Sequence, residues 1–251
     1  MKKYLLLTMA LLLLGVTSSA GVFTIPSAEA QMSLIVAGGG TPAAPDGDIF
    51  TADETWNFDD NSFSGLTDTS TANMTMAVSD AAALNGSAYG VVITATADTG
   101  DGAYLSASTA TDYSDEVGFR FHLKILDGAS TTFNGKIVNL LNLYEDSQFE
   151  AEGQIQLYYS SGWSLRDSKG TNAVALSTDT DYEIMVRFVY NDPNSGFQVW
   201  VNDVKEIDDL NYTASRSYVG FFYFGIIPST GNMSSGSVFY LDDLQVGTIT
   251  P

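Results

Sequence analysis

Short segments in which every second residue is apolar dominate the sequence from Trp56 onward. The clearest runs from Val117 to Ile125, where apolar residues alternate with polar positions that include Arg120, His122 and Lys124. Successive side chains of a β-strand point to opposite faces, so this pattern predicts a strand with one buried face and one polar face. Nowhere does the spacing of apolar residues favour a long amphipathic helix.

The same alternation predicts the rest of the secondary structure. Two hairpins are expected, one over 152–166 with its turn at Ser160-Ser161-Gly162, and one over 182–202 with turn-forming residues at 191–196. Further strands are expected at 89–95, 103–108, 137–144, 218–226 and 238–246. Roughly ten or more short strands without a crossover helix predict an all-β fold, a two-sheet antiparallel jelly-roll sandwich.

The N-terminal residues have the features of an export signal. A charged start at Met1-Lys2-Lys3 precedes the apolar run Tyr4–Val16, and Ala28-Glu29-Ala30 resembles a cleavage motif. This order predicts a signal peptide over 1–30 and a secreted protein, extracellular or periplasmic. The apolar run is shorter than the ~20 residues of a transmembrane helix, so no membrane insertion is expected after signal cleavage. An uncleaved N-terminal anchor and an original start at Met32 remain alternatives.

Two further segments follow the expected signal. Residues 31–54 are rich in Gly, Ala, Pro and Asp, which predicts a flexible N-terminal segment. Residues 55–251 then form one lectin-like β-sandwich domain, because a single sandwich commonly runs to about 200–250 residues.

The charge balance excludes some classes of partner. The chain has 30 acidic residues against 10 basic ones, a net charge of −20, and no cysteine. Nucleic-acid binding needs clustered Lys and Arg, so no nucleic-acid partner is expected. Partners are expected to be neutral, cationic or bridged by a metal. Stability must come from burial or bound ions, because no disulfide can form.

Two stretches resemble the concanavalin A-like lectin/glucanase superfamily, which includes laminin-G-like modules. One is Ser177–Phe188 with its partner Phe197–Asp203, and the other is the closing stretch Val238–Gly247. The resemblance implies a jelly-roll fold. The superfamily includes lectins, adhesion modules, glycosidases and polysaccharide lyases, so the fold leaves the activity open.

The resemblance also implies a structural Ca²⁺ between the first and last strands. Asp59 and Asp60 near the start of the domain and Asp243 near its end match that arrangement. Calcium takes six to eight oxygen ligands, which carboxylates and backbone carbonyls supply. The alternative is that these residues only stabilise turns, which Asp favours through hydrogen bonds to its own backbone.

A glycan or polysaccharide is the expected ligand. Aromatic side chains can stack on sugar rings, while amides and guanidinium groups hydrogen-bond to hydroxyls. Glutamines and other polar residues on the outward side of their strands would form a groove if these strands are adjacent. The candidate residues are Tyr158, Trp163, Trp200, Gln154, Gln156, Arg187, Gln198 and Asn202. Alternatively, the aromatic residues serve packing, with Trp163 covering the core beneath its turn.

Catalysis is a second possibility. His122, Arg120 and Tyr158 suit a polysaccharide lyase, because a lyase needs a cation beside a uronate carboxylate and a group that moves protons. Glu150 and Glu152, at alternate positions, suit a glycosidase pair. The motifs that the superfamily's enzymes carry at such strands are not matched, and a salt-bridged outer face explains Arg120 and His122 equally.

The sequence therefore predicts a secreted, non-catalytic carbohydrate-binding module of lectin or adhesion type. The first alternative is a lyase or glycosidase of the same fold. The second is a structural surface or assembly subunit that makes contacts through sheet edges or through residues 31–54. The oligomeric state is left open.

Overall fold

The computed structural model describes residues 49–132, 134–145, 153–170, 172–190, 195–210, 218–227 and 232–250. They belong to one compact unit. The expected signal peptide, residues 31–48 of the expected N-terminal segment, and the candidates Glu150 and Glu152 lie outside the described residues.

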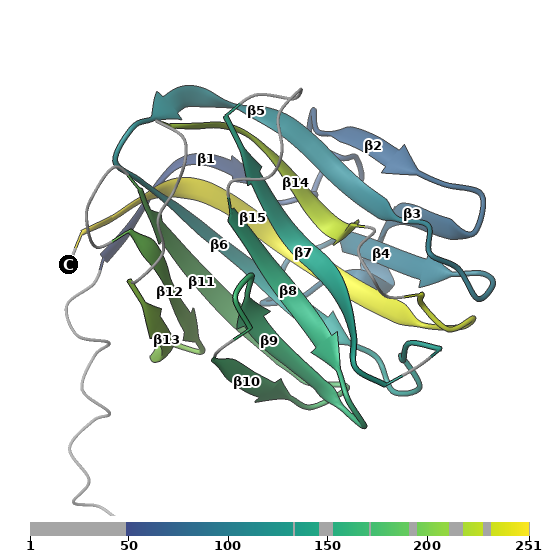
Figure 1. Ribbon diagram of the computed structural model, residues 1–251. Coiled ribbons are helices and arrows are strands. Elements are labelled where there is room, and N and C mark those ends of the chain that lie inside the picture. The colour runs from purple at the N-terminus through teal and green to yellow at the C-terminus, as the bar shows by residue number, and fades with distance from the viewer. Residues whose placement is uncertain are drawn as a thin grey trace, which may run out of the picture. The chain divides into compact units, whose positions relative to one another are not determined.

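Two antiparallel sheets pack face to face as a sandwich, which confirms the predicted fold class (Figure 1). Sheet A has the order β13 (Val204–Asp209), β12 (Gly196–Val201), β11 (Asp181–Val189), β6 (Glu116–Ile125), β15 (Val238–Thr250), β4 (Gly90–Ala95), β3 (Met74–Ser79), and β1 (Ile49–Trp56) also pairs with β15. Sheet B has the order β10 (Ala173–Leu176), β9 (Trp163–Asp167), β8 (Gly153–Tyr159), β7 (Lys136–Tyr144), β14 (Val219–Ile227), β5 (Ala103–Tyr113), β2 (Thr67–Ser70). The one helix in the described ranges, η1 (Asp80–Ala82), is far too short to cross a membrane.

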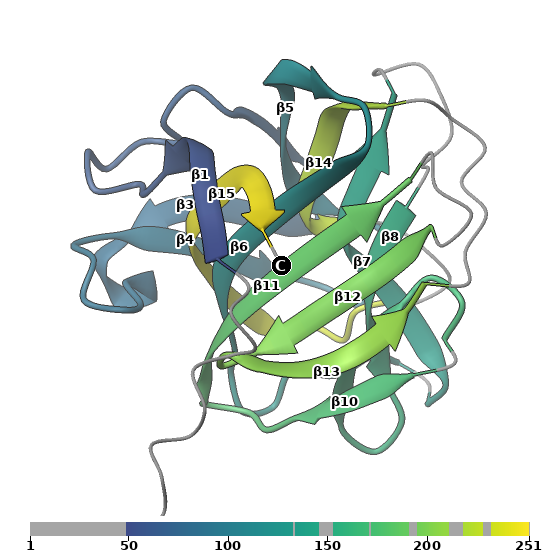
Figure 2. The same ribbon diagram turned by 90° about the vertical axis from the view of Figure 1, so that its left-hand side faces the viewer.

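The sandwich begins earlier than the sequence predicts. Strand β1 pairs with the last strand from Ile49, so residues 49–54 belong to sheet A and not to a flexible segment (Figure 2). A register shift between Ala52 and Glu54 interrupts the alternation of β1. That irregularity removes the two-residue pattern by which a strand is recognised in a sequence.

The core forms where the inward side chains of the two sheets meet. Phe119 and Phe121 of β6 face Phe222 and Phe224 of β14, with ring centroids 5.5 and 4.8 Å apart in the pairs Phe119–Phe222 and Phe121–Phe224. All four rings are fully buried. Aromatic pairs at this separation add to the hydrophobic contribution of their burial. As the alternation predicts, the strand over Val117–Ile125 has one face in the core and one face on the outside of the sandwich.

Truncation of a core ring should destabilise the fold strongly. We expect Phe224→Ala to lower the free energy of unfolding by about 3–5 kcal/mol, because it removes buried apolar surface and leaves a cavity between the sheets. The matched control is Val204→Ala on the edge strand β13, where the side chain is 56% exposed; it should change stability by less than about 0.5 kcal/mol. Urea unfolding followed by fluorescence measures both, and equal effects would contradict this account of the core.

Candidate functional site

The outer face of sheet B has a polar row that crosses four adjacent strands. Gln154 of β8 lies opposite Asn142 of β7, Asn142 opposite Tyr223 of β14, and Tyr223 opposite Ser106 of β5. Neighbouring strands lie about 4.8 Å apart, so the row is a continuous surface. It is built entirely from outward-facing positions of strands whose alternate residues form the core.

Four aromatic rings make up one side of this surface. The centroid of Tyr223 lies 4.7 Å from that of Tyr104, 4.8 Å from that of Tyr144 and 5.3 Å from that of Phe221. Burial raises the pKa of Tyr104 and of Tyr144, so both phenols stay protonated at neutral pH. The rings thus form a neutral aromatic cluster on the outside of the sandwich, where no core packing requires them.

Amide side chains occupy the middle of the surface. Asn139 and Asn142 are 5% and 4% exposed, and the Oδ1 atom of each is buried without a hydrogen-bond partner. The Nδ2 atom of Asn142 donates to the Tyr144 hydroxyl at 3.1 Å, and Nε2 of Gln156 donates to Oε1 of Gln154 at 3.1 Å. A buried acceptor left without a donor costs about 1–3 kcal/mol, so these two oxygens need a donor from elsewhere.

Arg166 and Tyr158 border the amides on the side of β9. The guanidinium carbon of Arg166 lies 4.5 Å from the centroid of the Tyr158 ring, and its Nε atom donates to Oε1 of Gln156 at 3.2 Å. This surface, the amide–tyrosine face, consists of Tyr104, Ser106, Asn139, Asn142, Tyr144, Gln154, Gln156, Tyr158, Arg166, Phe221 and Tyr223.

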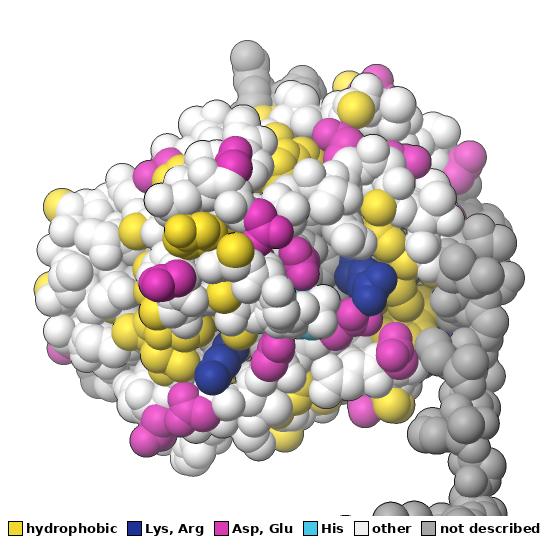
Figure 3. All heavy atoms as spheres, turned by 180° about the vertical axis from the view of Figure 1, so that it is seen from behind, with side chains coloured by type: hydrophobic (Ala, Val, Ile, Leu, Met, Phe, Trp, Pro, Cys, Tyr) yellow, Lys and Arg dark blue, Asp and Glu magenta, His cyan; other side chains and the backbone are white. Residues whose placement is uncertain are grey.

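This face differs sharply in charge from the opposite one. On the described outward positions of β7, β8, β9 and β14 there is no Asp, Glu or His side chain. The outer face of sheet A, by contrast, has ion pairs Arg120–Glu183 and Arg187–Glu116, with His122 beside them. Figure 3 shows basic side chains of that face next to acidic ones, with the histidine almost covered. Although the chain has a net charge of −20, the described outward positions of these four strands therefore have no carboxylate.

The sequence-predicted binding residues do not form a single groove. Gln154, Gln156 and Tyr158 lie together on the amide–tyrosine face. Arg187, Gln198, Trp200 and Asn202 lie on sheet A or in its β12–β13 turn, on the other side of the sandwich. The strands of the two hairpins are therefore not adjacent, and the condition for a joint groove is not met.

The two candidate tryptophans, Trp163 and Trp200, are buried and do not offer a stacking surface. Trp163 is 3% exposed, packs against Phe239, and donates from Nε1 to the Ala129 carbonyl at 2.9 Å. Trp200 is 1% exposed and packs with Met185 and Ile249, because the end of β15 covers it. Trp163 therefore packs beneath its turn, as the alternative reading has it, and neither ring presents an open face for a sugar in this structure.

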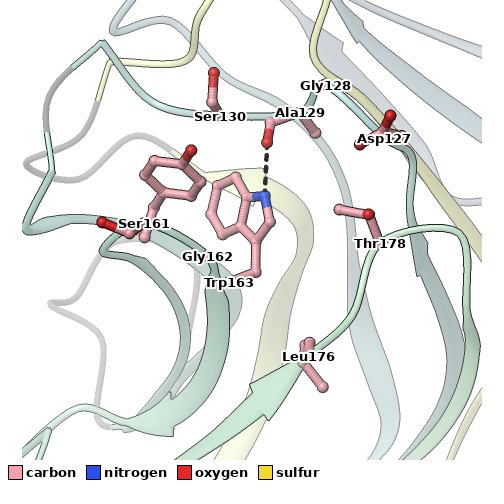
Figure 4. A pocket seen from close by; sticks show the side chains of 10 residues that line it. Asp127, Gly128, Ala129, Ser130, Ser161, Gly162, Trp163, Leu176 and Thr178 are labelled. Atoms are coloured by element: carbon pink, nitrogen blue, oxygen red, sulfur yellow. Dashed lines mark hydrogen bonds between the residues drawn. The ribbon is translucent and has the colours of Figure 1, made fainter.

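Trp163 does reach the wall of a hollow at one end of the sandwich (Figure 4). The hollow measures about 410 Å³ and lies between the loop after β6, the β8–β9 turn and the segment after β10. Tyr159, Ser161 and Thr178 also line it. It lies at the ends of the strands and is separate from the row of amides on the sheet.

The residues of the lyase alternative are divided in the same way. His122 and Arg120 lie on the outer face of sheet A, whereas Tyr158 lies on the outer face of sheet B. The core separates them, so they cannot act on one substrate atom. His122 Nδ1 lies 3.0 Å from Asp181 and Nε2 lies 3.6 Å from Glu183, which makes it part of an ion-pair network. Sequence reasoning missed Asn139, Asn142, Tyr104, Tyr144 and Tyr223.

The expected calcium ligands converge only in part. The Asp59 carboxylate accepts from the Ala88 amide at 2.7 Å, and the Asp243 carboxylate accepts from the Asn85 side chain at 3.5 Å. Burial raises the pKa of Asp243, and the two carboxylates accept hydrogen bonds from the same loop, at Asn85 and Ala88. Asp60 instead accepts from the backbone and hydroxyl of Ser62 within its own turn.

A buried carboxylate that sequence reasoning missed stands beside this pair. Asp242 is fully buried and accepts from the Leu84 amide at 2.8 Å and from the Ser87 hydroxyl. It thereby fixes the loop before β4 to the last strand. Among the described residues, no three or more His, Asp and Glu side chains are grouped as a metal site requires. The donor set therefore fits calcium only if backbone carbonyls complete the ligands of Asp59 and Asp243.

No protein-family model matches the sequence, and neither does any curated protein. The structure matches the cellulose induced protein Cip1 with a TM-score of 0.54 at 9% identity, over 78% of this chain and 97% of Cip1. It matches the alginate lyase vAL-1 from Chlorella virus with a TM-score of 0.53 at 13% identity, over 79% of this chain and all of the lyase. The fold is the concanavalin A-like jelly roll. A sialidase matches with a TM-score of 0.51 at 14% identity, over 79% of this chain and only 18% of the sialidase.

The ion-pair network on sheet A should make stability depend on pH. The interaction with His122 is the largest cause that lowers the pKa of Glu183 from its ordinary 4.5 to about 2; burial opposes it and Arg120 adds to it. A carboxyl with a lowered pKa stabilises the fold fully above pH 4.5, and this stabilisation is lost as the pH falls towards 2.

We expect the wild type to lose about 2 kcal/mol more stability than Glu183→Gln between pH 5 and pH 3. Urea unfolding at both pH values measures the difference. Glu206→Gln, on the exposed side of β13, is the matched control and should behave as the wild type does. Parallel losses in all three proteins would show that Glu183 is not bound to its partners.

Proposed function

We propose that the protein is an exported carbohydrate-binding module that holds a glycan on the amide–tyrosine face. The observation on which the proposal rests is the pair of buried, unpartnered amide oxygens of Asn139 and Asn142 beside an exposed-side cluster of tyrosines. Sugar hydroxyls are donors that would satisfy such acceptors once the amide groups turn towards the surface, and tyrosine rings are the surfaces on which sugar rings stack. The two features together define a site for a polyhydroxylated ligand.

The shape of the face supports binding along a chain of sugars. From Arg166 of β9 to Ser106 of β5 the face crosses five adjacent strands, a length of about 19 Å. Rings on β5, β14 and β7 supply apolar contact, and the amides of β7 and β8 supply hydrogen bonds. A polysaccharide laid across the strands would meet both along its length.

The charge of the face supports a binding role over glycosidase catalysis, and the similarities support a polysaccharide as the ligand. Glycosidase chemistry needs a pair of carboxylates, and the described outward positions of β7, β8, β9 and β14 have none. The names of two structures that share the fold refer to polysaccharides, cellulose for Cip1 and alginate for the lyase. The export signal expected over 1–30 would place the module where such polymers occur.

Binding should depend on the amide–tyrosine face alone. A glycan array probed with residues 31–251 identifies a ligand, and calorimetry then compares variants. We expect Asn142→Ala and Tyr223→Ala each to weaken affinity about tenfold or more, because each removes a contact worth ~1–3 kcal/mol. Gln198→Ala, an amide on the opposite sheet, is the control and should bind as the wild type does.

Two outcomes would count against the proposal. Loss of binding in Gln198→Ala with retention in Asn142→Ala would move the site to sheet A. Conversion of the bound glycan into an unsaturated product, followed by ultraviolet absorbance, would replace the binding role by lyase chemistry.

We also propose that Ca²⁺ binds between Asp59 and Asp243 and joins the start of the domain to its last strand. The support is the attachment of both carboxylates to the loop that contains Asn85 and Ala88. An ion there would offset the repulsion between the two charges and add ligands from flanking backbone carbonyls.

Millimolar CaCl₂ should raise the melting temperature of the wild type by several degrees relative to excess chelator, because only the folded state presents both carboxylates. Asp243→Asn should abolish the shift, while Asp60→Asn, whose carboxylate is engaged in its own turn, should keep it. An unchanged melting temperature in the wild type would dismiss the calcium site. Differential scanning fluorimetry measures all three proteins.

A further inference from the structure

Among the three arginines that the structure describes, Arg166 is the one without a carboxylate partner. Arg120 pairs with Glu183 and Arg187 pairs with Glu116, both on sheet A. Arg166 lies on the amide–tyrosine face, and none of the described outward positions of β7, β8, β9 and β14 is an acid. Its sequence neighbour Asp167 points inward, is 1% exposed, and accepts from the backbone amides of Lys169 and Gly170.

The guanidinium is nevertheless held in one place. Its Nε atom donates to Gln156, and its plane lies by the ring of Tyr158. Gly170 forms the third support: a Cβ atom there would lie 3.0 Å from Nη1 of Arg166, and the residue has a φ of +67°. Glycine leaves this space open at a backbone conformation that other residues rarely adopt. The contacts engage Nε and the faces of the group and leave the Nη atoms without a hydrogen bond to the described residues.

A fixed arginine with free Nη groups is suited to one chemical class of ligand. The guanidinium presents parallel N–H donors that match the two oxygens of a carboxylate, and a group already ordered loses little entropy when it binds. A neutral sugar would need no such charge. In a chain of net charge −20, an arginine without an ion-pair partner among the described residues is open to a carboxylate of a ligand.

We propose that the glycan bound on the amide–tyrosine face carries carboxylates, and that Arg166 binds one of them. This inference rests on the proposed function and adds the substrate class, a uronic-acid polysaccharide. The tyrosines stack on the sugar rings and the asparagines hydrogen-bond to the hydroxyls. Arg166 binds the carboxylate of the sugar at the β9 end of the face. Gln156 is a positioning residue, because its Oε1 atom orients the guanidinium.

A glycan array that includes neutral, uronic-acid and sulfated polysaccharides tests the class. We expect the bound polymers to contain uronic acids. Polymers bound only among the neutral glycans, or only among the sulfated ones, would overturn the inference and leave the glycan-binding function standing. An array without any bound polymer, with the protein shown to be folded, would overturn both.

The role of Arg166 is tested with one bound polymer and the same polymer after chemical reduction of its carboxylates to alcohols. The wild type should bind the native polymer about tenfold or more tightly than the reduced one. Arg166→Gln should lose that preference by weakening binding to the native polymer alone, and Arg166→Lys should keep only part of it. Tyr223→Ala is the control and should weaken binding to both polymers equally. Equal preference in the wild type and Arg166→Gln would contradict the assignment.

Discussion

The packing of two rows of buried rings, Phe119 and Phe121 against Phe222 and Phe224, is the interaction on which the rest of this molecule depends. It holds the sheets together without a disulfide, since the chain has no cysteine. It also fixes the direction of every other side chain on these strands, because neighbours along a strand point to opposite faces. Once Phe222 and Phe224 are inside, Phe221 and Tyr223 must be outside, and the aromatic cluster of sheet B follows.

The two outer faces then take different chemical characters. Sheet A satisfies its charges internally, through pairs such as Arg120–Glu183. Sheet B leaves two amide oxygens without a hydrogen-bond partner and one arginine without a carboxylate partner among the described residues. Unsatisfied buried acceptors reduce the stability of a fold, so folding does not explain the Oδ1 atoms of Asn139 and Asn142. A ligand that donates hydrogen bonds to them would explain both atoms. The net charge of the chain suggests neutral or cationic partners, but it describes the whole molecule, and the local charge at Arg166 has the opposite sign.

Alternation in the sequence predicts which residues leave the core, but not which outer face they join. Gln156 and Gln198 have the same outward position in their strands and lie on opposite sides of the molecule, because their strands belong to different sheets. Sheet membership depends on long-range pairing, about which local pattern says nothing. The fold class and the burial of Val117–Ile125 were therefore predictable, whereas a single groove that joined both hairpins was not.

The outward position of Asn139 and Asn142 could not be predicted, because strand β7 is irregular. Asn139 and Asn142 are three positions apart and both face outward, because a register shift between Asn139 and Leu141 changes the alternation of β7. In the stretch Phe221-Phe222-Tyr223-Phe224, aromatic residues occupy both faces of the strand, so the sequence does not show which of them point outward.

The most direct test of the account is to follow side-chain amide signals by two-dimensional NMR during titration with the polymer selected on the array. The NH₂ signals of Asn142 and Gln154 should shift in proportion to the bound fraction, while those of Gln198 and Asn202 on the opposite sheet should stay in place. Shifts confined to Gln198 and Asn202, with Asn142 and Gln154 unmoved, would contradict the placement of the glycan on the amide–tyrosine face.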